Sequence, residues 1–568
     1  MEKNRMSLRA WILFVVIVII GAMIRFIKLS DFPPALYVDE ALVGYNAASL
    51  LYDLRDEAGD FLPLAFRAWG TYTAPLQYYL AMVGTFFFGL NEFGTRFHSA
   101  FLGSLTVPLT FFVARKLTRQ ISIALLAAFF LAFSPWHIHQ SRMAVETTAS
   151  LFFLSLGIYF FLVWREKEKI PWFLLSAASF VLTLYAYHTG RMTTPLILIV
   201  LLVCSWTVVR GHVRHILIGG MIGAVLIFPL AWHTIVDYEK ITARPRAINV
   251  FADKNVPLQL WKDVTSDGDM PANIIRFFHN KLFGYTEDVL WRYVSHFEPL
   301  FLFTAGDPHE RFEIPHTGLL LLSGIILVPV GVWVLIKRKA MRERRWIIFG
   351  WILIPPIVSS LAFITPNSYH MLEAVVPWMI VLGFGFSEVI RSSRKVHRFL
   401  PFLLYIFLIV NGVHFVVQYT EEIPRGLAPK WAYGFKEAAS FIKERQSSFD
   451  RVIFSNRVYI LMLYYWKYPP QQFRQEAVRD TQLDQWGFEH VRQFGQYEFE
   501  TDFSWDQIEK REGILYVVES GKIPDYWTDA DVDEIFRKTG KKPSNRLQRL
   551  KQIFYPNGEK ALELVEIV

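Results

Sequence analysis

The sequence predicts a polytopic α-helical membrane protein with a C-terminal α/β domain, and two observations carry this fold class. The 568 residues are 53% hydrophobic and 16% aromatic, only 19% are charged, and the mean hydropathy is +0.28. The apolar residues are gathered in runs of membrane-spanning length, which is not the pattern of a large soluble enzyme. The net charge of +8 is explained by basic loops facing the cytoplasm, so we expect no nucleic-acid partner.

The apolar runs predict the individual spans. Residues 9–27 have spanning length, begin with basic residues and lack a small-residue cleavage site, which indicates a retained signal anchor. The further runs that could span lie at 97–116, 121–136, 147–163, 171–188, 193–209, 214–233, 317–336, 346–365, 371–389 and 399–418. The single cysteine, Cys204, lies inside one of these runs, so no intramolecular disulfide can form.

Clusters of Lys and Arg predict the direction of the spans, because short basic loops stay in the cytoplasm. They occur at 3–9, 115–119, 165–169, 210–214, 337–345 and 391–398. All of them can be cytoplasmic only if the apolar stretch 75–90 does not cross, and its length and opening proline suit a re-entrant or interfacial helix. We therefore expect about eleven spans in the inner or plasma membrane, with the N-terminus inside and the C-terminus outside.

This topology brings three segments to the outer side: residues 28–96, residues 234–316 and the tail after residue 418. The inner loops are short basic connectors, so a functional site is expected to face outward. We expect a transmembrane domain at residues 1–418 and an extracytoplasmic α/β domain at residues 419–568.

The tail differs in composition from the rest of the chain. "PKWAYGFKEAASFIKERQ" has helical periodicity, whereas "RVIFSN", "GILYVVES" and "ALELVEIV" are typical of buried strands. It contains no glycine-rich phosphate loop, which favours an accessory domain that covers a site or helps to hold an acceptor.

Asp39 and Glu40 stand side by side in "ALYVDEALVGYNAA", shortly after the first apolar run. Two carboxylates at the edge of a bilayer are costly unless they do chemistry or pair with something. Asp39 would then be a general base, with Glu40 as its partner. The alternative is that Asp39 caps a helix beginning near Ala41. The residues alone leave both interpretations open.

Two outward arginines are candidates for holding a phosphate. Arg142 and Glu146 are four residues apart, hence on one helix face at the outer end of a span. They would form a salt bridge with each other, or Arg142 would bind a phosphate through its planar guanidinium, with Glu146 near the substrate. Arg191, between two spans on the same side, would bind phosphate or only reach for the interface.

A third polar group lies in "FLFTAGDPHERFEIPHTGLL" next to a membrane entry. It gathers Asp307, His309, Arg311 and His316, which together suit an anionic headgroup. No histidine pair has ligand spacing with a matching third residue, so no metal site is expected and no cofactor is required; a divalent cation is compatible with the chain but not indicated.

Aromatic residues follow the carboxylate pair in "FRAWGTYTAPLQYYL". An interfacial aromatic belt is the usual explanation, and stacking against a sugar is the alternative. In the second case Tyr72 would contact the substrate.

Several motifs together resemble the bacterial branch of the family 39 glycosyltransferases. The resemblance rests on "DE" after the first span, then on "RDEAGDFLPLAFRAWGTYTAPLQYYL", "GLNEFGTRFHSAFLGSLTV", "LAFSPWHIHQSRMAVE" and "YAYHTGRMTTPL". It covers about the first 230 residues, continues more loosely through "GDPHERFEIPHTG" and "TPNSYHMLEAVVPW", and lapses in the tail. His370, in the last of these motifs, is a further substrate-binding candidate. These enzymes have the GT-C fold and are related to protein O-mannosyltransferases and aminoarabinose transferases.

The resemblance implies an activity and its site. Such enzymes move a sugar from a polyprenyl monophosphate carrier, with inversion, to a hydroxyl on protein, lipid or glycan outside the cytoplasm. Asp39 would be the catalytic base and Glu40 its partner, while phosphate contact by Arg142, Arg191 and Arg311 is our own extension. The chain departs from the aminoarabinose transferases at residues 72–75, "YTAP", where they carry an acidic residue before a proline pair. A metal site borrowed from that branch is therefore not expected.

A transporter or lipid flippase is the competing class. It would share the many spans, but it should show internal repeats or ionisable residues near the middle of the membrane. The sequence shows no clear repeat, and its charges avoid the centres of the apolar runs.

Overall fold

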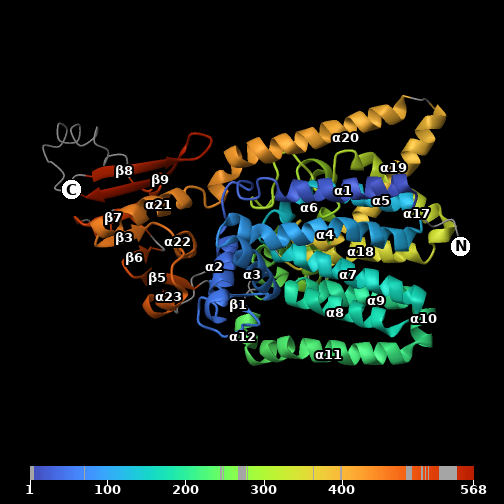
Figure 1. The fold of residues 1–568 in the computed structure, drawn as a ribbon, viewed down its shortest axis with the longest axis horizontal. Coiled ribbons are helices and arrows are strands. Elements are labelled where there is room, and N and C mark those ends of the chain that lie inside the picture. The colour runs from blue at the N-terminus through green and yellow to red at the C-terminus, as the bar shows by residue number, and fades with distance from the viewer. Residues whose placement is uncertain are drawn as a thin grey trace. The chain divides into compact units, whose positions relative to one another are not determined.

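The computed structural model describes residues 6–69, 71–242, 246, 249–266, 277, 279–362, 364–396, 399–480, 489–500, 503–505, 507–509, 511–523 and 547–567. The chain forms two compact units (Figure 1). Unit 1 comprises Met1–Leu29, Thr73–Gln77 and Phe97–Thr420, and unit 2 comprises Ser30–Tyr72, Tyr78–Arg96 and Glu421–Val568.

Apolar helices make up most of unit 1, and in Figure 1 they run side by side along their length. They are α1 (Leu8–Phe26), α4 (Glu92–Thr118), α5 (Ile121–Ala132), α6 (Pro135–Ser141), α7 (Glu146–Lys167), α8 (Ile170–Ala186), α9 (Gly190–Cys204), α10 (Trp206–Gly211), α11 (Val213–Val236), α17 (Gly324–Lys337), α18 (Arg344–Ser360), α19 (Val375–Val396) and α20 (Leu400–Val417). The first residues of α4 belong to unit 2.

The helices confirm the membrane class. Within the described residues, 6 helices are long and apolar enough to span a membrane, or up to 7 if the bent pair of α5 and α6 counts as one. Shorter apolar helices are α3 (Leu76–Phe88), α8, α9 and α17. The 13 residues of α3 reach only about 20 Å at 1.5 Å per residue, less than the roughly 30 Å of a hydrocarbon core. The count of about eleven spans stays a prediction.

The chain bends by 56° between α5 and α6. Arg25 stabilises this bend through hydrogen bonds to the end of α5. Ser134 and Pro135 start a new helix there, with the Ser134 side chain accepting from the amide of His137. The last carbonyls of α5 therefore need other donors. The fully buried Arg25 guanidinium donates to Leu131 O at 3.1 Å and Ala132 O at 3.3 Å.

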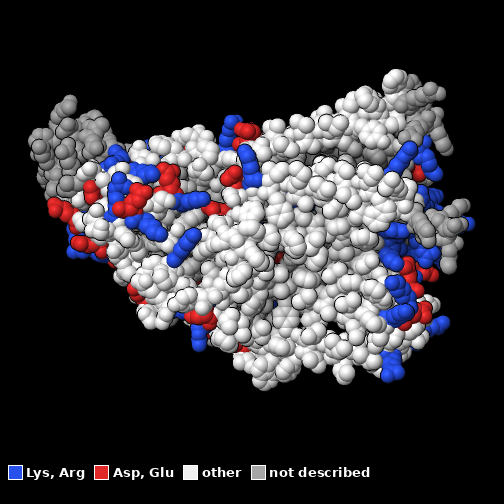
Figure 2. All heavy atoms as spheres, in the orientation of Figure 1, with Lys and Arg blue, Asp and Glu red and all other residues white. Residues whose placement is uncertain are grey.

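The basic clusters of unit 1 lie together at one end of the bundle. Lys116 at the end of α4 pairs with Glu166 near the end of α7, and Arg165 pairs with Glu343 at 2.7 Å. Arg344 also donates to Leu117 O at 3.4 Å. Figure 2 shows Lys and Arg gathered at that end, with an almost uncharged surface along the helices. This arrangement supports the expectation that these loops share one side of the membrane.

Shorter elements connect α11 to α19. They are α12 (Tyr238–Ile241), η2 (Val250–Ala252), α14 (Asn255–Ser266), α16 (Lys281–Ser295), the π-helical turn η3 (Leu300–Thr304), η4 (Lys339–Met341) and η5 (Leu372–Ala374). Parts of the expected outer loop 234–316 lie outside the described residues.

Unit 2 combines a loop segment, Ser30–Tyr72 and Tyr78–Arg96, with a tail segment, Glu421–Val568. The loop segment contains α2 (Val38–Asp53), β1 (Phe66–Ala68) and most of β2 (Thr71–Thr73) and α3. The tail segment contains η6 (Gln418–Leu427) in greater part, η7 (Ala428–Lys430), α21 (Phe435–Arg445), η8 (Gln446–Ser448), β3 (Arg451–Phe454), α22 (Tyr459–Trp466), α23 (Pro470–Glu476), β4 (Val478–Asp480), β5 (His490–Phe494), β6 (Tyr497–Phe499), β7 (Ile514–Glu519), β8 (Leu547–Phe554) and β9 (Lys560–Ile567).

The tail strands form a mixed sheet of seven strands in the order β4-β5-β6-β3-β7-β9-β8. β3 is parallel to both β6 and β7, and the other neighbours are antiparallel. The expected helix is α21, and the three expected strands are β3, β7 and β9, so the α/β character of the tail is confirmed.

Candidate functional site

Asp39 and Glu40 both lie in the first turn of α2. The helix begins at Val38, with Tyr37 as the N-cap, and the amide of Tyr37 donates to Glu40 Oε2 at 3.1 Å. Asp39 is half-buried within this turn, where the partial positive charge of the helix N-terminus favours a carboxylate. The alternative in which Asp39 caps a helix starting near Ala41 is therefore wrong.

Both carboxylate oxygens of Glu40 accept hydrogen bonds from the guanidinium of Arg96 in α4. Arg96 Nε donates to Glu40 Oε1 at 2.9 Å and Nη2 donates to Oε2 at 3.0 Å. Arg96 also donates to Pro33 O at 3.0 Å and Ala35 O at 2.6 Å, in the chain that leads into α2. Both side chains are buried, so a planar two-point contact fixes the first turn of α2. Spacing along the sequence gave no sign of this pair.

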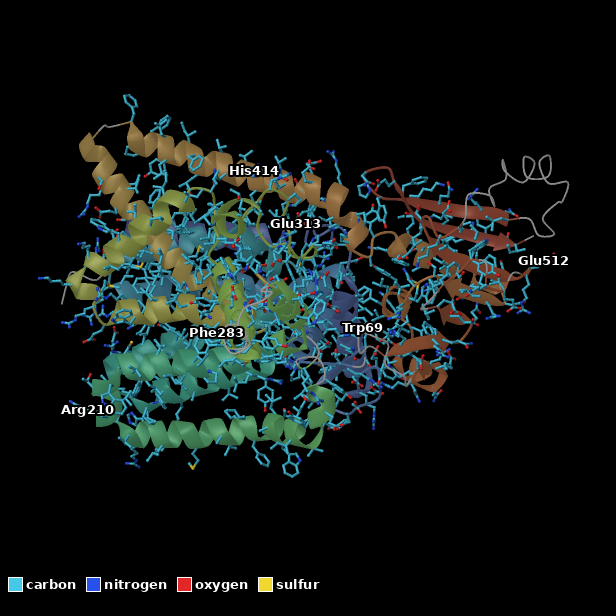
Figure 3. All side chains as sticks on the ribbon, turned by 180° about the vertical axis from the view of Figure 1, so that it is seen from behind. Trp69, Arg210, Phe283, Glu313, His414 and Glu512 are labelled. Atoms are coloured by element: carbon cyan, nitrogen blue, oxygen red, sulfur yellow. The ribbon has the colours of Figure 1, made fainter. Side chains whose placement is uncertain are left out.

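Tyr72 also belongs to unit 2, on the half-buried strand β2. β1 and β2 form a two-stranded sheet, and the tail segment contacts the turn between them. Arg67 forms an ion pair with Glu489, whose amide donates to Trp69 O at 3.0 Å; Trp69 is labelled in Figure 3.

Arg142 and Glu146 both lie in unit 1, but Arg142 is the C-cap of α6 whereas Glu146 is the first residue of α7. The expectation that they lie on one helix face is therefore wrong, because the helix is interrupted between them. The buried guanidinium of Arg142 donates from Nη1 to Ile24 O at 2.7 Å and from Nη2 to Lys28 O at 3.0 Å, so it satisfies carbonyls at the C-terminal end of α1. Glu146 Oε2 accepts from Gln77 Nε2 at 2.9 Å. Arg142 thus has a structural task that four-residue spacing did not suggest.

Arg191 lies in the first turn of α9. Its Nε donates to Leu184 O at 3.1 Å, and among the described residues its two Nη groups have no partner. The side chain is only half-buried. Arg191 therefore offers the planar pair of donors that a phosphate accepts.

Asp307, His309 and Arg311 lie in one loop of unit 1. Asp307 accepts from the amide of His309 at 2.7 Å and from the amide of Ser368 at 2.6 Å, which ties two loops of unit 1 together. The carbonyl of Arg311 lies 3.1 Å from His139 Nε2. Burial raises the pKa of Asp307 to about 6. A partly open cavity of about 10 Å³, about the volume needed for one water, lies beside Asp307, His139 and Ser368.

An aromatic stack joins His309 to His370. His309 lies 5.3 Å from Phe312, Phe312 stacks on Tyr369 at 4.5 Å, and the Tyr369 and His370 rings are 5.9 Å apart. His316 is not part of it: its side chain is exposed. The carbonyl of His316 instead lies 3.0 Å from His414 Nε2 of α20 (Figure 3).

Glu373 is a buried carboxylate that the motifs did not reveal. It lies at the outer end expected for α19, is 2% exposed, and accepts from Ser150 Oγ of α7 at 2.5 Å. Among the described residues, no hydrogen bond is found for its second oxygen, Oε2. A lone Glu in an apolar run was the one signal that could have pointed to it.

The expected site residues are thus divided between the two units. Unit 2 carries Asp39, Glu40 and Tyr72, and unit 1 carries the candidate arginines, the histidines and Glu146. Among the described residues, no group of three or more His, Cys, Asp or Glu side chains could hold a metal ion.

Comparisons with known proteins agree with the fold. Residues 15–237 match the family described as dolichyl-phosphate-mannose-protein mannosyltransferase. An uncharacterized protein of Aquifex aeolicus (strain VF5) is 30% identical over 186 residues, which are 32% of this chain and 36% of that protein. The chain thus matches little more than a third of this relative's length.

Solved structures extend the likeness over the whole chain. ArnT from Cupriavidus metallidurans in the apo state has a TM-score of 0.55 at 13% identity, and ArnT bound to undecaprenyl phosphate has 0.52 at 11%; each match covers 98% of both chains. The oligosaccharyltransferase of Archaeoglobus fulgidus, in a complex with Zn and sulfate, has 0.52 at 10%, over 97% of this chain and 72% of that one. At these identities the likeness concerns the fold. Residues 15–237 therefore resemble the dolichyl-phosphate-mannose-protein mannosyltransferase family, and the chain has the GT-C fold of ArnT.

Proposed function

We propose that this protein is an inverting glycosyltransferase that moves a hexose or pentose from a polyprenyl-phosphate carrier to a hydroxyl on the outer face of the membrane. One observation carries the proposal: the family domain at residues 15–237 includes a carboxylate pair in which Glu40 is locked by Arg96 while Asp39 is half-buried on the same helical turn. A relative by fold, ArnT, is described as bound to undecaprenyl phosphate, which supports a polyprenyl-linked donor.

The reaction requires one base and one group that stabilises negative charge. The acceptor oxygen attacks the anomeric carbon, its proton passes to the Asp39 carboxylate, and the bond from that carbon to the phosphate oxygen breaks. The sugar is transferred with inversion, and the polyprenyl phosphate leaves with the electron pair. No nucleotide is consumed, because the donor already carries a phosphoester leaving group.

Arg191 is the best candidate for contact with the leaving phosphate. Cationic donors fixed before the reaction stabilise the charge that develops on the phosphate, and the two Nη groups of Arg191 are available for this. Arg142 and Arg311 remain proposals of lower rank, since Arg142 already serves carbonyls of α1 and the Arg311 guanidinium lies over the Phe312 ring at 4.9 Å.

We assign the reaction to the extracytoplasmic side of an inner or plasma membrane, with the tail segment on that side. The acceptor hydroxyl belongs to a protein, a lipid or a glycan. His309, His370, Glu146 and Tyr72 are proposed to contact donor or acceptor, and the exposed His316 is retained only as a surface candidate.

The test is Asp39→Asn in purified full-length protein. Polyprenyl-phosphate hexoses and pentoses are first screened against protein, lipid and glycan acceptors by mass spectrometry, and transfer is then measured at saturating donor. Asparagine keeps the size of the side chain but cannot take the proton, so we expect transfer to fall roughly 100-fold or more, with an unchanged thermal midpoint.

Asp31→Asn is the matched control, because Asp31 is exposed in the same loop segment and should leave transfer unchanged. Near wild-type transfer by Asp39→Asn would refute the assignment of the base. No consumption of any polyprenyl-phosphate sugar, together with movement of such lipids across vesicles, would favour a flippase instead.

A further inference from the structure

We propose that the tail segment of unit 2 is a positioning element for Asp39, acting by clamping α2 through Arg474 and Glu57. This rests on the proposed role of Asp39 as the base. It gives the C-terminal α/β part of the chain a task in the reaction, beyond that of a separate accessory domain.

The first step of the argument is the contact between α2 and α22. At Gly44, in the middle of α2, an added Cβ would lie 2.5 Å from Tyr464 Cε2 and 2.5 Å from Thr95 Oγ1. The Tyr464 hydroxyl and Thr95 Oγ1 are 2.8 Å apart and buried. Only glycine allows α22 to approach α2 this closely. The two helices are therefore fixed at one crossing point.

The second step is the C-terminal end of α2, which Arg474 of α23 holds. Arg474 pairs with Asp53, the last residue of the helix. Its Nη1 also donates to Ser49 Oγ at 3.2 Å and to Asp56 O at 3.0 Å. One guanidinium thus joins a side chain at the helix end, a side chain one turn earlier and the backbone that follows.

The third step is Glu57, which anchors the same region from inside. It is 1% exposed, and its amide donates to Asn46 Oδ1 of α2 at 2.8 Å. Its Oε1 accepts from the Tyr459 hydroxyl at 3.0 Å and lies 3.7 Å from Arg479 Nη2. Burial disfavours the charged carboxylate and raises the pKa of Glu57, whereas Arg479 and Tyr459 favour the charged form. The tail segment therefore supplies the groups that stabilise this buried carboxylate.

These contacts act on Asp39 because α2 is a single continuous helix. Its 16 residues span about 24 Å at 1.5 Å per residue. Arg96 fixes the first turn, and the tail segment fixes the middle and the last turn. Releasing the middle and the far end leaves the Glu40–Arg96 contact alone to orient the first turn, so the helix can rotate at that contact and redirect the Asp39 carboxylate. A misplacement of about 1 Å at a reacting group can cost as much as 100-fold in rate.

The experiment uses full-length protein and compares Arg474→Ala and Tyr459→Phe with wild type, each measured per folded molecule. We expect kcat to fall about tenfold to 100-fold, with KM for the lipid donor little changed, and Arg474→Lys to recover part of kcat. Arg451→Ala is the matched control, since Arg451 of β3 pairs with Glu498 and Glu509 of the tail segment and should leave kcat unchanged.

A double-mutant cycle separates positioning from a general loss of structure. If the tail acts through Asp39, adding Arg474→Ala to Asp39→Asn lowers the residual turnover by less than about twofold. Equal loss in both backgrounds, or unchanged kcat per folded molecule in the single variants, overturns the proposal. Wild-type transfer by Asp39→Asn alone would instead overturn the proposed base, which is a separate and distinguishable result.

Discussion

Arg96 holds Glu40 in a two-point ion pair, with Nε to Oε1 at 2.9 Å and Nη2 to Oε2 at 3.0 Å, and both side chains are buried. The pair orients the first turn of α2 and leaves Asp39 as the carboxylate of that turn with the greater exposure. Two neighbouring acids of the same chemical type thus have different environments, which is how one can serve as an anchor and the other as a base.

Arg96→Ala should destabilise the protein strongly, because it leaves Glu40 as a buried charge without its partner. Breaking a buried pair costs about 3 to 5 kcal/mol. Arg96→Lys should recover the charge but not the two-point geometry, so thermal stability should recover more than transfer does. The measurements are the thermal midpoint and transfer per folded molecule.

The matched control for this prediction is Arg391→Ala. Arg391 pairs with Glu388 at 2.6 Å, but its side chain is 65% exposed, so the change should cost less than about 1 kcal/mol. An Arg96→Ala protein as stable as this control would show that the Glu40 pair does not hold α2.

Arg191→Ala should weaken use of the lipid donor while leaving the fold intact. Its guanidinium keeps only the Leu184 carbonyl as a partner within the described chain, and loss of one charge-assisted contact to phosphate costs on the order of 1.5 to 3 kcal/mol. We expect KM for the donor to rise, with partial recovery in Arg191→Lys. Donor titrations at saturating acceptor provide the measurement.

Arg142→Ala should lower the stability of the protein without changing its use of the lipid donor. It removes the donors for Ile24 O and Lys28 O, so the thermal midpoint should fall while the donor KM of the folded fraction stays the same. A higher donor KM with no loss of stability would instead assign phosphate contact to Arg142, and an unchanged donor KM in Arg191→Ala would remove Arg191 from the site.

Asp307 predicts a pH dependence of stability. Burial raises its pKa from 3.8 to about 6 in the folded state, so the folded protein holds a proton that the unfolded chain has already lost. The stabilisation from this proton is full below pH 4 and is lost as pH rises to about 6, with a change on the order of 2 to 3 kcal/mol. The thermal midpoint of wild type relative to Asp307→Asn should therefore fall between pH 4 and pH 7. A constant difference across this range would contradict the assignment.

The topology is tested with single cysteines at positions 60, 260 and 480 in a Cys204→Ser background. All three are predicted to react with an impermeant maleimide in intact cells, because the basic clusters lie on the opposite side. Asp60 and Asp480 belong to the same compact unit, so they must be labelled together. Labelling at 60 with protection at 480 would rule out the predicted topology.

Much of the fold could be read from local patterns. The apolar runs gave the apolar helices of unit 1, closely at 147–163, which lies in α7 (Glu146–Lys167), and less closely at 317–336, where α17 begins only at Gly324. The strand patterns gave β3, β7 and β9. These features depend on periodicity within a short window, which a single sequence displays directly.

The partners of the candidate site could not be read in this way. Glu40 and Arg96 are 56 residues apart, and Asp53 and Arg474 are 421 apart. Such pairs are created by tertiary packing, and no periodicity encodes them. The same limit explains why the start of α2 was misplaced. A carboxylate before an apolar run resembles an N-cap, but the N-cap of α2 is Tyr37, and the amide of Tyr37 donates to the Glu40 side chain.

The bend between α5 and α6 bears on how the chain is assembled in the membrane. Arg25 donates to carbonyls that lie 106 and 107 residues further along the chain, so α1 is synthesised before the residues that bind its guanidinium. A charged side chain is costly in lipid, by roughly 2.5 to 3.5 kcal/mol at a helix centre. Arg25 is the penultimate residue of α1 (Leu8–Phe26), a position from which its side chain can reach the membrane surface before α5 is in place. Burial of the guanidinium thus depends on a break in a span that is made later than α1 itself.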